Sequence, residues 1–73
     1  MKVTDTSTRL RIGQRISELR RMRGLTQSDL ASLTGYDRTN IAKIELGRYS
    51  VGVDVLSTIA KALDATLEIQ PLN

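Results

Sequence analysis

Four polar side chains lie within six residues near the middle of the chain: Arg38, Thr39, Asn40 and Lys43. Arginine and lysine donate hydrogen bonds that suit O6 and N7 of guanine, and threonine can contact the methyl group of thymine. Thr39 and Lys43 are four residues apart, so on a helix they share one face. These residue types fit a surface that reads base edges in double-stranded DNA. A solvated polar helix face is the alternative, and the commoner one for such residues taken alone.

The residues before this stretch predict a short helix that ends in a tight turn. Thr26 is a natural N-cap for a helix over about 27–34, and Asp29 stands at its third position in a variant of the capping box. Gly35 ends the helix and permits the positive φ of a sharp turn. Ala31 is small, so we expect the next helix to cross closely over it.

Asp37 is expected to cap that next helix, over about 38–46. Its carboxylate can accept hydrogen bonds from free amides and favours the positive end of the helix. The weaker alternative is that it accepts from the amino group of a cytosine. Leu30, Ile41 and Ile44 are expected to fill the space between the two helices.

Two further helices complete an expected all-α fold. One is predicted over about 9–23, capped by Thr8, and another over about 53–63. Gly13 lies inside the first of these at a cost of about 1 kcal/mol relative to alanine. Another backbone is therefore expected to approach Gly13 closely.

The end of the chain changes its period. Residues 66–70 alternate polar and apolar side chains and precede Pro71, a pattern typical of a strand. A lone strand leaves its backbone unpaired, so the economical partner is the same strand of a second subunit. A poorly formed fifth helix or a frayed tail is the alternative. The strand hypothesis assigns dimerisation to Thr66, Leu67, Glu68, Ile69 and Gln70.

Composition limits the function classes. The 73 residues make one domain and include no cysteine or histidine, so disulfides are excluded and neither a metal nor a cofactor is expected. The chain also lacks a phosphate-cradling glycine loop and a convincing carboxylate pair, which argues against an enzyme. With two aromatic residues, Tyr36 and Tyr49, it is a poor stacking platform for single strands or RNA.

Charge is unevenly distributed. Residues 1–49 carry ten Lys and Arg against five Asp and Glu, whereas residues 50–73 carry one against three. A basic front suits a polyanion, and a solvated arginine-rich helix is the alternative. No segment approaches the roughly 20 apolar residues of a membrane span, and the first residues lack the apolar core of a signal peptide. We therefore expect a cytoplasmic protein without a membrane partner.

From about residue 10 to residue 63 the chain resembles the Cro/Xre-type helix-turn-helix family of bacterial and phage repressors. The matching strings are Ile12-Gly13-Gln14-Arg15-Ile16, Leu19-Arg20, Gly24-Leu25-Thr26-Gln27, Leu30-Ala31, Gly35, Ile41, Ile44-Glu45 and Gly47. The resemblance implies a compact, lambda-repressor-like bundle of four or five helices that binds palindromic operators as a homodimer. The expected organisation is a flexible tail over 1–8, a helix-turn-helix DNA-binding domain over 9–64 and a dimerising strand or tail over 65–73.

The resemblance also implies roles for single residues. Arg38, Thr39 and Lys43 match base-reading positions of the recognition helix. Contacts to the DNA backbone or its rim are expected from Gln27, Ser28, Asn40, Arg48 and Tyr49. Support of the recognition helix is expected from Arg20, Glu45, Asp37, Ala31 and Gly35, with Arg20 and Glu45 forming an ion pair. Leu46 departs from the family, which often has a polar residue there, so the resemblance implies no phosphate contact at this position.

The sequence thus predicts a sequence-specific transcriptional regulator, a dimeric repressor that reads the major groove of double-stranded DNA. The alternative is an antitoxin that binds a toxin protein and represses its own promoter. A stand-alone phage-type repressor or a restriction-modification controller is an equally open form of the first hypothesis.

Overall fold

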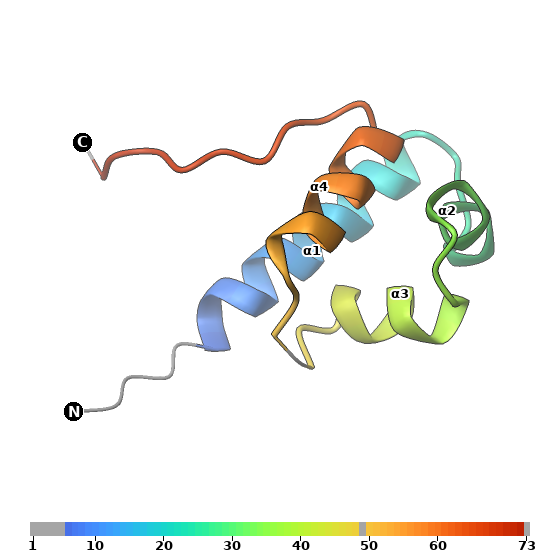
Figure 1. Cartoon of the computed structure of the whole chain (residues 1–73), viewed down its shortest axis with the longest axis horizontal. Helices are drawn as coiled ribbons and strands as arrows, with labels where there is room; N and C mark the ends of the chain where they lie inside the picture. Colours follow the sequence, from blue (N-terminus) through green and yellow to red (C-terminus); the bar gives the residue numbers. More distant parts are fainter. Residues whose placement is uncertain (1–5, 49, 73) are drawn as a thin grey trace.

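Four helices make up the fold that the computed structural model gives for residues 6–48 and 50–72 (Figure 1). They are α1 (Thr6–Met22), α2 (Gln27–Thr34), α3 (Arg38–Glu45) and α4 (Val53–Ala62). α3 contacts both α1 and α2, and α2 also contacts α4. The all-α fold predicted from the sequence is confirmed. No helix in these two ranges is long and apolar enough to cross a membrane.

The helix-turn-helix unit supplies the centre of the core. Leu30 of α2 and Ile41 of α3 are completely buried, and Ile44 is nearly so. This confirms that the three side chains fill the space between the two helices. The other buried apolar residues come from α1, α2 and the α4 region: Ile16, Ala31, Ile59 and Leu63.

α2 has the ends that the sequence predicts. The Thr26 hydroxyl accepts a hydrogen bond from the Asp29 amide at 3.0 Å, and the Asp29 carboxylate accepts one from the Thr26 amide at 2.8 Å. At the other end Gly35 adopts φ +77° and its amide donates to the Ala31 carbonyl at 2.9 Å. The capping box and the glycine turn therefore fix both ends of α2 locally.

The predicted start of α1 is wrong by three residues. The helix begins at Thr6, so Thr8 lies inside its first turn, and the predicted flexible tail over 1–8 is helical from residue 6 onward. The Thr8 hydroxyl accepts from the Arg11 guanidinium at 3.4 Å. Further along α1, Leu10 lies against the backbone at Gly47.

The C-terminal segment forms neither the predicted strand nor a fifth helix in this single chain. Ala65 still packs against the core, and residues 66–72 continue from it as an irregular segment (Figure 1). No second strand in the described part of the chain offers a partner for its backbone. Ile69 and Leu72 are fully exposed on this segment.

Gly13 has the close backbone neighbour that the sequence predicts. A Cβ atom there would lie 2.5 Å from the carbonyl oxygens of both Ile44 and Glu45. Real Cβ atoms essentially never come this close to backbone. The absence of a side chain therefore lets the end of α3 rest directly on α1.

Replacing Gly13 by alanine is expected to destabilise the chain. The added methyl group must push α3 off α1, and such overpacking costs about 1–3 kcal/mol, more than the helix propensity that alanine adds. Urea unfolding followed by circular dichroism measures the change. Gly52→Ser is the control, because nothing lies within 4 Å of a Cβ there and serine suits the N-cap of α4. Equal stability of the G13A variant and the wild type would contradict the close contact.

Candidate nucleic-acid interface

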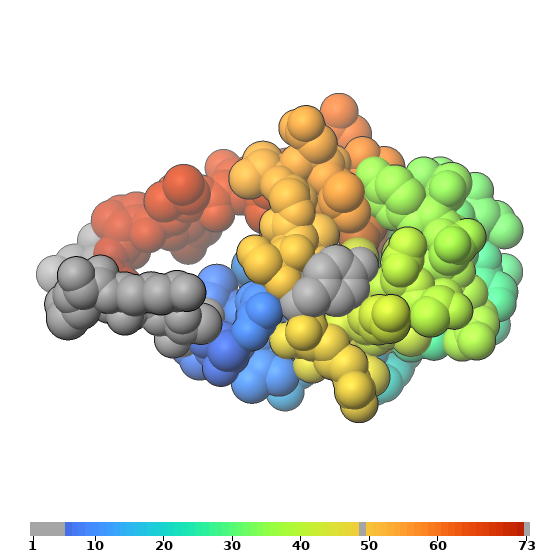
Figure 2. Space-filling model, turned by 60° about the horizontal axis from the view of Figure 1, so that its bottom comes forward, coloured from blue at the N-terminus to red at the C-terminus, as the bar shows by residue number. Residues whose placement is uncertain are grey.

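α3 turns a polar face outward. Arg38, Thr39, Asn40 and Lys43 are all exposed, while Ile41 and Ile44 on the opposite face are buried. Figure 2 shows the α2–α3 part of the chain at the outer surface of the molecule, well away from the C-terminal segment. The structure therefore places the predicted base-reading residues together on one accessible helix face.

The cations of this face are Arg38 and Lys43. Within residues 6–48 and 50–72, neither Arg38 nor Lys43 makes a hydrogen bond or an ion pair through its side chain. By contrast, Arg15, Arg20 and Arg23 of the α1 region each pair with a carboxylate. The charge on the α3 face is thus available to an external anion.

A buried ion pair attaches the far end of α3 to α1. Arg20 Nε donates to Glu45 Oε2 at 2.7 Å and Arg20 Nη2 donates to Glu45 Oε1 at 3.0 Å. The two side chains are only 10% and 6% exposed. Arg20 Nη1 also donates to the Leu25 carbonyl at 2.8 Å, which fixes the guanidinium against the start of the α1–α2 turn.

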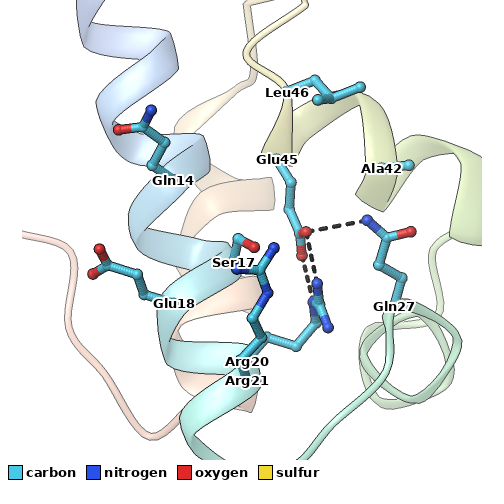
Figure 3. Close-up of a pocket in the computed structure, with 9 residues that line it drawn as sticks. All are labelled: Gln14, Ser17, Glu18, Arg20, Arg21, Gln27, Ala42, Glu45 and Leu46. Carbon is cyan, nitrogen blue, oxygen red and sulfur yellow. Dashed lines mark hydrogen bonds and ion pairs between the residues drawn. The ribbon is translucent and has the colours of Figure 1, made fainter.

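The first residue of α2 reaches the same carboxylate. Gln27 Nε2 donates to Glu45 Oε1 at 3.1 Å, so one carboxylate joins α1, α2 and α3 (Figure 3). The contact leaves one amide N–H of Gln27 for another acceptor. These residues border an open hollow of about 580 Å³, whose lining is Gln14, Ser17, Glu18, Arg20, Arg21, Gln27, Ala42, Glu45 and Leu46.

The Glu45 carboxyl is held ionised by its partners. Burial by itself raises its pKa, but hydrogen bonds from Arg20, Gln27 and Ser17 and the charge of Arg20 outweigh burial, so the pKa lies below its ordinary value. The same hydrogen bond to Glu45 raises the pKa of Arg20. Both groups stay charged near neutral pH, and the link between the helices persists there.

Asp37 begins α3 but does not cap it as predicted. It has the extended backbone of an N-cap, φ −71° and ψ 144°, yet its side chain makes no hydrogen bond to the helix. The first turn of α3 is open to water, which can satisfy both the carboxylate and the free amides. The predicted capping hydrogen bond is therefore wrong.

Comparison with known proteins agrees with this geometry. The sequence model of the helix-turn-helix family matches residues 16–70. The chain belongs to the helix-turn-helix family. This membership confirms the resemblance seen in the sequence.

Several helix-turn-helix proteins are similar to this chain. It is 40% identical over 52 residues to the immunity repressor protein of Bacillus phage phi105, covering 71% of this chain and 36% of that protein. It therefore spans little more than a third of that relative. The restriction-modification controller protein C.AhdI from Aeromonas hydrophila superposes with a TM-score of 0.77 at 37% identity, over 81% of this chain and 89% of that one. The clp gene regulator ClgR from Corynebacterium glutamicum gives 0.76 at 26% identity, over 80% and 62%.

The remaining predicted contact residues of this helix-turn-helix chain lie around α3. Ser28 is exposed beside Gln27, and Arg48 is exposed just after the turn that ends α3. Tyr49 lies outside the described residues. Leu46 is 57% exposed at the C-cap of α3 and borders the hollow, so an apolar side chain stands where the family often has a polar one.

Two supporting residues were missed by the sequence analysis. Ser17 is buried three residues before Arg20, and its hydroxyl contributes to the lowered pKa of Glu45. Arg23 donates to the Leu63 carbonyl at 2.8 Å and to Asp64 at 3.1 Å, which ties the end of α1 to the end of α4. Ser17 could have been found from the sequence, because it is three residues from Arg20 and so shares a helix face with it. No sequence pattern indicated the role of Arg23.

Removing one member of the Arg20–Glu45 pair is expected to cost more stability than removing both. Arg20→Met or Glu45→Leu alone strands a buried charge, at about 3–5 kcal/mol, whereas the double variant leaves an apolar contact. Urea unfolding of the four proteins measures the difference. Arg15→Ala is the control, since it breaks an ion pair whose side chains are 65% and 60% exposed and should change stability by less than about 1 kcal/mol. A double variant less stable than either single variant would contradict the prediction.

Acid is expected to remove the contribution of Glu45. Because its folded-state pKa is lowered, that contribution is complete above the unfolded-state value of about 4.3 and is lost as the pH falls through the lower folded value. The R20M/E45L double variant lacks it, so its free energy of unfolding should fall less between about pH 6 and pH 3. The pKa of Asp29 is also lowered, chiefly by the Thr26 amide, but this acts equally in both proteins. If the free energy of unfolding falls equally in the wild type and in the double variant over this pH range, the prediction is wrong.

Proposed function

We propose that this chain is the DNA-binding module of a transcriptional regulator, a dimeric repressor that reads a palindromic operator through the major groove. The observation that carries the proposal is α3, which exposes Arg38 and Lys43 with no ion-pair partner among the described residues and is attached to α1 by the buried Glu45 at its end. A repressor, a controller protein and a gene regulator among the similar proteins support it.

Roles on the DNA follow from residue chemistry. Arg38 and Lys43 donate to O6 and N7 of guanine, and Thr39 contacts a thymine methyl group. Phosphate contacts give register and orientation but no sequence information. These are assigned to Gln27 and Ser28 at the start of α2, Asn40 within α3, and Arg48 and Tyr49 after it.

Anchoring of α3 matters for this readout. A recognition helix that shifts against its scaffold loses the fixed relation between phosphate contacts and base contacts. In this chain Gln27 contacts the Glu45 carboxylate of α3 directly. The phosphate-contacting and base-reading elements therefore enter the groove as one unit.

The C-terminal segment supplies the dimer in this proposal. Its Ile69 and Leu72 are fully exposed, and apolar side chains on an unpaired segment favour association. Pairing of residues 66–70 between two copies would give one recognition helix to each half-site, with half-sites about 34 Å apart. No observation on the described residues favours the antitoxin alternative, and the toxin partner stays a prediction.

Substitutions on α3 should separate base reading from phosphate binding. With a duplex selected by the wild type from a random library, Arg38→Ala or Lys43→Ala should cost about 1–3 kcal/mol and relax the base preference. Arg48→Ala should weaken binding to all duplexes alike and reduce the slope of log affinity against log salt by about 1. Fluorescence anisotropy at several salt concentrations measures both, and sedimentation of the complex should give two chains per duplex.

Lys61→Ala is the matched control, because it removes an exposed positive charge from α4. It should leave the base preference and most of the affinity unchanged. If R38A and K43A both keep the affinity and the base preference of the wild type, the assignment of α3 as the recognition helix is wrong.

A further inference from the structure

The carboxylate of Asp37 has no partner in the part of the chain that the structure describes. It makes no capping hydrogen bond and takes part in no ion pair. Asp29, the acidic residue at the start of α2, accepts a hydrogen bond from the Thr26 amide instead. Of the two acidic residues at the starts of the helix-turn-helix helices, only Asp37 keeps its acceptor atoms free.

The backbone that carries this carboxylate is fixed on both sides. Tyr36 is half-buried and packs against the core, and the amide of the fully buried Ile41 donates to the Asp37 carbonyl at 3.1 Å. The Asp37 residue itself is exposed. A free acceptor is thus presented from a defined position.

That position is the leading end of α3, next to Arg38. In helix-turn-helix proteins the N-terminal residues of the recognition helix contact base edges, so this step rests on the proposed function. DNA phosphates repel a negative charge held there. A carboxylate at this point therefore weakens binding to every sequence except one that donates a hydrogen bond to it.

The major groove offers few donors. Guanine and thymine present only acceptors, whereas cytosine presents its N4 amino group and adenine its N6 amino group. Adenine places the N7 acceptor beside N6, which repels a carboxylate and suits an amide side chain instead. We propose that Asp37 is a specificity-determining residue that accepts a hydrogen bond from N4 of a cytosine and rejects the other bases at that position.

Selection from a random duplex library by the wild type and by the Asp37→Asn variant tests this proposal. The wild type should favour cytosine at one position of each half-site, on the order of tenfold over the next base. The D37N variant should lose that preference and move toward adenine, which an amide reads in bidentate fashion. Asp37→Ser, which places a residue suited to an N-cap before α3, should lose the preference without gaining another.

The control is Asp54→Asn, which removes one exposed negative charge from the first turn of α4. It should leave the base preference of the wild type unchanged. A cytosine preference that survives in D37N, with affinity for all duplexes raised by the same factor, would overturn the inference and make Asp37 a simple electrostatic brake.

The result also separates this inference from the proposed function. Suppose that the wild type selects a defined duplex, but that every position at which D37N tolerates all four base pairs is tolerated by the wild type as well. This result overturns the role of Asp37 alone. A wild type that enriches no duplex overturns both.

Discussion

One buried carboxylate connects three of the four helices of this chain. Glu45 accepts hydrogen bonds from Arg20 of α1 and Gln27 of α2 while belonging to α3. Burying such a pair costs several kcal/mol of desolvation per ion, so its net effect on stability is small or unfavourable. The pair instead fixes the orientation of α3, because only one placement of this helix lets both donors reach the same carboxylate.

Backbone contact makes that placement possible. The end of α3 lies against the backbone of Gly13 in α1. This close approach brings the Glu45 side chain within reach of Arg20, which is also in α1. Packing contributes the rest through Leu30 and Ile41, which lose all contact with water. Polar and apolar contacts thus specify the same orientation of α3, which is the consistency expected of a sequence with one fold.

Local chemistry was the part that the sequence could predict. The capping box of Thr26 and Asp29 and the turn at Gly35 depend on neighbours within a few residues, and both are present. Gly13 was readable because a helix tolerates an internal glycine only for a reason. The Arg20–Glu45 pair spans 25 residues and was available only through resemblance to a family.

The remaining predictions depend on features that local residue types do not determine. Whether Asp37 bonds its own helix depends on a rotamer and on water, which residue type does not determine. The strand over 66–70 stays a prediction, because it needs a second backbone that a single chain cannot supply.

The inward and outward residues of α3 tolerate substitution differently. Its inward residues are part of the core, whereas the exposed side chains of Arg38 and Lys43 make no hydrogen bond or ion pair within the described residues. New side chains at these outward positions therefore meet almost no structural constraint. Under the proposed function, substitutions at these positions change the base sequence that α3 recognises and leave the rest of the fold intact.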